Sequence, residues 1–448
     1  MPADRLPAQG DRELTLSSLR TARRVAPATG HRSGSLLRSS LWIVSVACMA
    51  AALLAGPALR WVDDRTRWEL LGFGADGARS VLGVLSASLL TFLVFCFSIL
   101  LLCVQLAGAQ LSPRIIARVF EGRLTKWTLG VFTFSFTYSL AALGRVEDRV
   151  PQLPVLLAIL LGLLSVALFL YLIQTTGRGF RPSAVLASVG ADTRRAIDVV
   201  YPQPYAPRGG APAEAPHTLP PDARSITHQG NAGVVVSFDA ATLADLSARS
   251  GCVVELVPQI GDFLSEEDAL FRVSGAGADA VDADALRRCV ALGPERTLEN
   301  DPAFGFRIIV DIAIKALSPA INDPTTAVLG IDQLERLLHL LGRRRFSAGV
   351  VPDPTGEARL VYRTPGWGDF VALAVTEIRL CAGQSVTVYR RLQAMIDRLL
   401  LVLPEERAAV LREESLLLRR TVERALADPQ DRALAGVRDM QGLGSPVR

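Results

Sequence analysis

Charged residues are missing from four long stretches of this chain, although they make up 21% of the whole sequence. The stretches are residues 39–59, 80–113, 127–144 and 151–177. About 20 apolar residues of helix cross the hydrocarbon core of a bilayer, and each stretch reaches or approaches that length. Buried helices of soluble proteins keep a polar face, which these stretches lack. The sequence therefore predicts four transmembrane helices, at about 41–59, 81–111, 127–144 and 153–176.

The predicted spans contain no His either. Carriers that couple transport to protons or ions keep ionisable groups in the membrane, where such groups are costly and serve transport. Their absence argues against active secondary transport. A passive pathway and a plain membrane anchor both remain consistent with these spans.

Little in the chain suggests a metal, a cofactor or catalysis. The six cysteines form no Cys-x-x-Cys pair and the four histidines lie far apart, so we expect no metal site and no cofactor. Gly72, Gly74 and Gly77 have the spacing of a dinucleotide-binding loop, but they lead into a predicted span and not into a βαβ unit. No nucleophile and base occur at a recognisable spacing, which makes an enzyme the least supported class.

Basic residues flank the predicted spans unevenly. Seven arginines precede the first span, and the loop before the third span carries Arg114, Arg118, Arg123 and Lys126. The other two loops have balanced charges. Cytoplasmic loops are enriched in basic residues, so we expect a multi-pass protein of the bacterial inner membrane with both termini in the cytoplasm. These arginines also account for the modest net charge of +4, which gives no reason to expect a nucleic-acid partner.

The rest of the chain divides by composition. Residues 1–38 have no hydrophobic period and are predicted to be disordered, and seven prolines between 202 and 221 indicate a linker. After the linker, β-branched runs give way to helical spacing of apolar residues, which predicts an α+β, mainly helical cytoplasmic domain. The predicted segments are a four-helix transmembrane domain at 39–177, a juxtamembrane helix at 178–200, a Pro-rich linker at 201–230, a small αβ unit at 231–275, a helical domain at 282–427 with a looser connection at 346–366, and a flexible C-terminus at 428–448.

Polar residues recur along one side of the second span. Thr91, Ser98, Gln105 and Ser112 are seven residues apart and share a slowly drifting helix face. The simpler interpretation is a seam for helix packing, because small and hydrogen-bonding residues let spans approach each other in lipid. The alternative is the lining of a hydrated pathway, although pore rings usually carry some charge. We favour the packing seam for this stripe.

Two acidic-proline steps precede predicted helices, in RTLENDPAFG at 296–305 and in ALSPAINDPTTA at 316–327. An Asp at the N-cap with Pro in the first turn is a typical helix start. If the two starts lie together, their free amides form a pocket for a small anionic ligand. The candidate ligand-binding residues are Arg296, Asp301, Lys315, Asn322 and Asp323. The simpler interpretation, which we favour, is a tight turn whose charges are solvated or paired.

Several of these segments resemble an uncharacterised family of predicted bacterial membrane proteins called domain of unknown function 2254. The similar segments are 105–114 (QLAGAQLSPR), 261–273, 296–305 and 316–327, and the most specific step is SPAINDP at 318–324. The resemblance covers nearly the whole chain after the predicted disordered start. It implies the membrane topology described above and supplies no activity.

Two functions therefore remain open. The first is a homo-oligomeric protein that forms a passive, channel-like pathway regulated by its cytoplasmic domain. The alternative is a membrane-anchored sensor or scaffold without transport. The expected partners are the lipid bilayer and further copies of the chain, with a small anion as a candidate ligand of the cytoplasmic domain.

Overall fold

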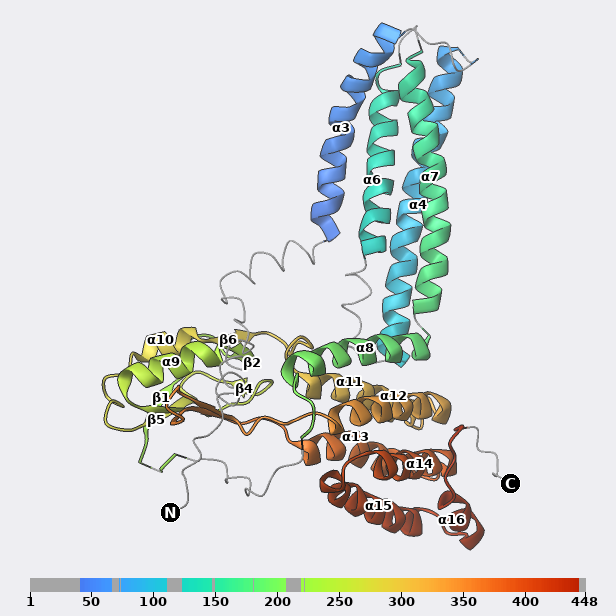
Figure 1. Cartoon of the computed structure of the whole chain (residues 1–448). Coiled ribbons are helices and arrows are strands. Elements are labelled where there is room, and N and C mark those ends of the chain that lie inside the picture. Colours follow the sequence, from blue (N-terminus) through green and yellow to red (C-terminus); the bar gives the residue numbers. More distant parts are fainter. Residues whose placement is uncertain are drawn as a thin grey trace, which may run out of the picture. The chain divides into compact units, whose positions relative to one another are not determined.

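The computed structural model describes residues 41–66, 72, 74–110, 123–146, 150–179, 181–206, 219–220 and 222–442. These residues form two compact units, one that ends at Val185 and one that begins at Leu186 (Figure 1). Several expectations fall outside the described residues: the disordered start at 1–38, the middle of the linker at 207–218, Ser112, and the last six residues of the chain.

The first unit is a bundle of four long helices. They are α3 (Leu41–Thr66), α4 (Ala75–Gln110), α6 (Arg123–Leu143) and α7 (Gln152–Gly179). Three of them contain segments long and apolar enough to cross a membrane, at Trp42–Asp63, Ala75–Leu102 and Gln152–Thr175. The predicted third span lies in α6, which is not among these three, so the count of four spans is not confirmed. Two basic residues, Arg123 and Lys126, lie near its start, and hydroxyl residues recur along the helix.

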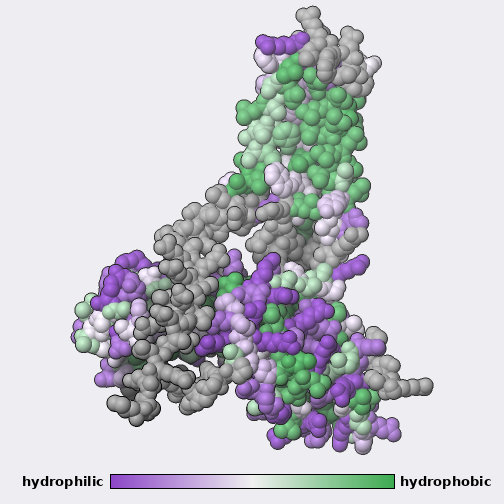
Figure 2. Space-filling model, in the orientation of Figure 1, coloured by the Kyte–Doolittle hydropathy of each residue, from purple (hydrophilic) through white to green (hydrophobic). Residues whose placement is uncertain are grey.

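Helix α6 lies at the centre of the bundle, in contact with α3, α4 and α7. Its Thr128, Ser135 and Ser139 are fully buried. Ser135 bonds across to α7, where the hydroxyl of Ser165 donates to it over 3.0 Å. The other three helices carry most of the exposed large apolar side chains of the bundle, and α6 adds Trp127 and Leu140; Figure 2 shows apolar side chains spread over the visible face of the bundle.

The second unit contains two β-sheets. A five-stranded sheet has the order β1-β5-β3-β8-β7, in which β3 and β8 are parallel and the other pairs antiparallel. A three-stranded antiparallel sheet has the order β4-β2-β6. The strands are β1 (Arg224–Thr227), β2 (Gly233–Phe238), β3 (Val253–Leu256), β4 (Phe263–Leu264), β5 (Ala269–Ser274), β6 (Val290–Gly293), β7 (Val350–Pro352) and β8 (Ala358–Tyr362).

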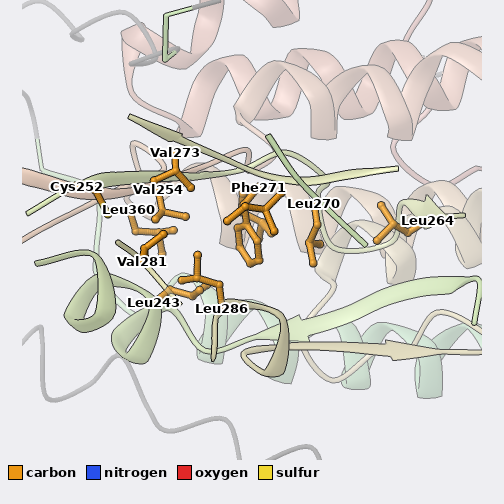
Figure 3. Packing of buried hydrophobic residues seen from close by; sticks show 12 residues of the cluster. Leu243, Cys252, Val254, Leu264, Leu270, Phe271, Val273, Val281, Leu286 and Leu360 are labelled. Carbon is orange, nitrogen blue, oxygen red and sulfur yellow. The ribbon is translucent and has the colours of Figure 1, made fainter. Parts of the chain in front are cut away.

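Two short helices cover the larger sheet and close its core. They are α9 (Ala240–Ser250) and α10 (Ala283–Arg288). Figure 3 shows Leu243 of α9 and Leu286 of α10 facing Phe271, Val254 and Leu360 of the sheet. Each of these five side chains is fully buried, which is worth about 1.5–3 kcal/mol apiece for residues of this size.

The remaining helices form layers in the second unit (Figure 1). Helix α11 packs on α12 and α13, α12 packs on α14, and α15 packs on both α13 and α14. Helix α8 lies close to α11 and α12. A Cβ atom on Gly305 of α11 would meet Thr193 of α8, and a Cβ atom on Gly190 of α8 would meet Gln333 of α12. The bounds are α8 (Pro182–Val200), α11 (Pro302–Ala316), α12 (Pro324–Gly342), α13 (Trp367–Cys381), α14 (Val386–Val402), α15 (Glu405–Ala425) and α16 (Pro429–Ala435).

The structure differs from the sequence expectation in three segments. The looser connection at 346–366 contains strands β7 and β8, which complete the sheet of the αβ unit. Strand β1 lies in the segment expected to be a linker. The C-terminal segment expected to be flexible contains α16 and then returns to α14, where the backbone carbonyl of Val437 accepts a hydrogen bond from Nε of the buried Arg390 over 2.9 Å.

Candidate functional site

The first acidic-proline step forms the start of α11. Asp301 is the N-cap, with Pro302 in the first turn, and its carboxylate accepts a hydrogen bond of 3.0 Å from the amide of Phe304. Nε and Nη2 of Arg296 approach the other carboxylate oxygen to 3.0 and 2.9 Å. The guanidinium also lies 5.6 Å from the centre of the Phe304 ring. The predicted cap is therefore present, and Arg296 neutralises it.

Burial affects the protonation of Asp301 in its pair with Arg296. Asp301 is 6% exposed, and its desolvation raises the pKa of the carboxyl group, while the Arg296 charge and the Phe304 amide work in the opposite direction. The backbone of Gly261, in the turn before β4, lies against the guanidinium: a Cβ at this position would be 2.0 Å from Nη2 of Arg296, and the φ of +93° already disfavours other residues. Arg296 is thus held between the sheet region and α11.

The second acidic-proline step forms the start of α12. Asp323 is the N-cap, and it accepts hydrogen bonds from the amide of Thr326 over 3.1 Å and from its hydroxyl over 2.5 Å. Asn322 has a φ of 49°, which Asn tolerates better than most residues. The amide of Asp323 bonds to the carbonyl of Ala316 over 2.8 Å. The segment between the two helices is therefore a closed turn.

The structure does not bring the two helix starts together. Helix α12 begins next to the last residue of α11, while Asp301 lies at the other end of that helix, about 22 Å away for 15 residues. Arg296 and Asp301 form one group, and Lys315, Asn322 and Asp323 lie at the opposite end of α11. Each cap carboxylate also occupies the amides that an external anion would use. These contacts agree with the simpler interpretation, and no pocket between the two starts is formed.

The polar stripe lies on the outer surface of the four-helix bundle. Thr91, Ser98 and Gln105 are all exposed, and none of them packs against α3, α6 or α7 in the way a seam inside the bundle requires. The hydroxyl groups of Thr91 and Ser98 each donate to a carbonyl of their own helix, those of Ala87 and Val94, over 3.0 Å. The three described residues of the stripe therefore lie on the outer surface of the bundle, not between its helices.

The comparisons with known proteins agree with the membrane character of the chain. Residues 38–398 match the family of predicted membrane proteins called domain of unknown function 2254. The chain belongs to this family. Uncharacterised proteins of Mycobacterium bovis and Mycobacterium tuberculosis are 27% identical to it over 416 residues, which span 89% of this chain and 79% of each relative. No solved structure matches the chain.

The residues matched by the family include both helix caps and the polar stripe. A cluster of aromatic residues around Arg407, which the sequence did not indicate, lies partly beyond the matched residues. The guanidinium carbon of Arg407 lies 4.7 Å from the ring centre of Phe346, 5.5 Å from that of Tyr205 and 5.7 Å from that of Trp367. The indole of Trp367 donates to the carbonyl of Arg407 over 3.0 Å. These residues come from four distant segments, so no local pattern could have identified them.

The cluster fastens the chain after α8 to the helical layers. The amide of Tyr205 donates to the carbonyl of Arg343 over 2.7 Å, and the amide of Arg345 donates to the carbonyl of Gln203 over 3.0 Å. Arg344 forms an ion pair with Asp198 of α8. The first residues of the predicted linker are therefore an ordered part of the second unit.

Buried ion pairs join the helical layers at two further places. Arg391 of α14 pairs with Asp332 and Glu335 of α12, and its side chain is almost entirely buried. Between α13 and α15, Nε of Arg379 and the nearer oxygen of Glu414 are 3.8 Å apart, beyond hydrogen-bonding distance. Among the described residues, no group of three or more His, Cys, Asp or Glu side chains is arranged to hold a metal ion.

Proposed function

We propose that this chain is a homo-oligomeric protein of the bacterial inner membrane that forms a passive pathway with four spans per copy, regulated by its cytoplasmic domain. The observation that carries the proposal is the outward-facing stripe on α4. Polar residues on the outer face of a bundle contact lipid unless another copy covers them, and polar groups in lipid favour association between helices. Further copies would place the stripe at an interface or along a central path.

The central position of α6 supports the fourth span. A span surrounded by other helices need not be as apolar as one that contacts lipid, and the Ser135 hydroxyl of α6 has a hydrogen-bond partner in α7. Cys48 and Val44 of α3 lie 3.0 and 3.2 Å from the Cβ position of Gly130 in α6, so both helices start at the same end. Both also have an exposed Trp near that start, Trp42 and Trp127, as expected at a membrane–water interface.

The length of α3 supports the same placement. Trp61, also exposed, follows Trp42 by 19 residues, which is about 28 Å of helix and close to the thickness of a hydrocarbon core. Aromatic residues thus lie at both expected interfaces.

The ordered chain after α8 supports regulation. Only a few residues separate the end of α7 at Gly179 from α8, and the segment after α8 is bonded to the helical layers. A change in the second unit would therefore have only a short stretch of sequence to cross before α7.

The stripe can be tested by cysteine labelling in a cysteine-free variant reconstituted into vesicles. Cysteines at Thr91, Ser98 and Gln105 should react with a small polar thiol reagent. Cysteines at Leu90 and Phe97 are the matched controls, because these residues are exposed on α4 but about 100° to 120° away from Thr91. Equal protection of all five, together with a monomer by mass measurement, would leave the anchored sensor or scaffold as the function.

A further inference from the structure

The second half of helix α3 is anchored to the rest of the bundle. Asp63 is buried, and its carboxylate accepts a hydrogen bond of 2.9 Å from the amide of Leu153 in the first turn of α7. Gly56 is buried as well, and a Cβ at this position would lie 2.6 Å from Nη1 of Arg145, which follows α6. Lipid tails are as apolar as the helices, so hydrogen bonds and close packing hold spans together. Both are present in this half of α3.

The first half of α3 is packed less tightly. None of the described residues 42–50 is buried, whereas Gly56 and Asp63 of the second half are. The first half approaches α6 at Gly130, whose Cβ position lies 3.0 Å from Sγ of Cys48. Such a contact competes with lipid tails of equal apolarity, so its loss costs little free energy.

A weak point of the helix lies between these two halves. Pro57, next to Gly56, has no N–H for the carbonyl of Leu53, and its ring crowds that carbonyl. Sharp bends in long helices are found mostly at such residues. A change of about 20° here would move residue 42, about 21 Å away along the helix, by about 7 Å. Ala52 is buried, but it lies only one turn from the weak point and would move by about 2 Å.

The loosely packed half of α3 lies at the end of the bundle where α7 leaves it. Tyr138 near the end of α6 donates to the carbonyl of Pro154 near the start of α7 over 3.3 Å, and Ser165 further along α7 bonds to Ser135 further back in α6. Helices α6 and α7 are therefore antiparallel, and α7 ends where α6 and α3 start. From this end the chain continues into α8.

We propose that residues 42–55 form an arm that swings on Gly56 and Pro57, away from α6, and that this movement opens the passive pathway. The contact between Cys48 and Gly130 is the closed position of the arm. The opening role rests on the proposed function, whereas the movement itself does not. Two experiments therefore test the movement and the opening separately.

Distances between spin labels test the movement, in a cysteine-free full chain in lipid nanodiscs diluted with unlabelled protein. One label replaces Val46 on the arm, or Val62 beyond the weak point as the matched control, and the second replaces Leu163 of α7; all three side chains are exposed. The distances from position 46 should spread over about 5 Å and those from position 62 should not. Pro57→Ala, at an exposed position, restores the missing hydrogen bond and should narrow the first distribution. Equally narrow distributions at both positions, or no effect of Pro57→Ala, overturn the proposal.

A disulfide tests the opening. Gly130→Cys, in a chain that keeps Cys48 as its one other cysteine, brings two cysteines close enough to form a disulfide that fastens the arm to α6. Oxidation should abolish the uptake of xylitol, a small neutral polyol, by vesicles that contain this variant, and reduction should restore it. Gly130→Ser is the control, and oxidation should not change its uptake. Failure of the disulfide to form, or unchanged uptake once it has formed, overturns the proposal. Absence of uptake in every variant, the unlocked chain included, overturns the pathway itself, and the spin-label distances then decide the movement alone.

Discussion

At the scale of single residues, the two cap residues of α11 and α12 have the same sequence context but different surroundings. Asp301 is buried and paired with Arg296, whereas Asp323 is half-buried and bonds only within its own turn in the contacts described. The sequence predicts both caps, because an Asp before a Pro at a helix start is a local pattern. It does not predict the contact of Gly261 with Arg296, the partner of Asp301, because that contact joins segments about 35 residues apart.

Asp301→Ala should therefore lower Tm more than Asp323→Ala. Loss of an N-cap costs about 1 kcal/mol in either variant, and Asp301→Ala also leaves Arg296 without its carboxylate. Thermal unfolding of the full chain measures both, and Asp301→Asn, which keeps the cap and removes the charge, separates the two contributions. An Asp323→Ala variant that melts at or below the temperature of Asp301→Ala would contradict a role for the ion pair.

Glu414 makes a pH-dependent contribution to the stability of the fold. Burial raises the pKa of its carboxyl group, and Arg379 opposes this only partly at 3.8 Å. A folded pKa above the unfolded value of about 4.3 means that folding takes up a proton, so this group stabilises the fold at low pH and loses that contribution as pH rises through the raised pKa. Glu414→Gln should gain stability relative to wild type as pH increases from about 4. A difference in Tm between Glu414→Gln and wild type that stays constant from acid to neutral pH would contradict this prediction.

At the scale of elements, the helices are easier to predict than the sheet. The 3.6-residue spacing of apolar residues locates α11 to α15, and the charge-free stretches locate the bundle. Strands β7 and β8 were missed because they are short and are separated by the turn from Asp353 to Gly356, which looks like part of a loop. The parallel pairing of β8 with β3 depends on tertiary packing, and no local signal encodes it.

The contact between α8 and α11 depends on a glycine. A Cβ on Gly305 would lie 2.0 Å from Oγ1 and 2.8 Å from Cβ of Thr193, so Gly305→Ala should push α8 away and lower Tm. Thr193→Ala in the same chain should restore part of the loss, because it removes the nearest atom. Gly368→Ala is the control: it sits in α13, and its new Cβ would have its nearest neighbour at 3.9 Å. Equal losses for Gly305→Ala and Gly368→Ala would show that helix α8 is not tightly packed.

At the scale of the whole molecule, the small αβ unit and the helical domain expected from the sequence lie together in one compact unit. The sheet takes strands from both sides of α11 and α12, and Arg407 of α15 lies over the ring of Tyr205, which follows α8 in the chain. A fragment of residues 182–442 should therefore unfold cooperatively, whereas residues 219–293, which hold β1 to β6 without β7 and β8, should aggregate or stay partly folded. Circular dichroism melts and size exclusion compare the two. A monomeric, cooperative shorter fragment would contradict this arrangement.

The parallel pair of β3 and β8 has a consequence for synthesis. Strand β3 ends at Leu256 and its partner β8 begins at Ala358, about 100 residues later. At 5 to 20 residues per second, the ribosome needs about 5 to 20 s to make the intervening chain. During this interval one edge of the apolar strand β3 stays open on the nascent chain, and an unpaired edge recruits other strands. Synthesis of the segment between β3 and β8 is therefore the period in which two nascent copies can pair through this edge.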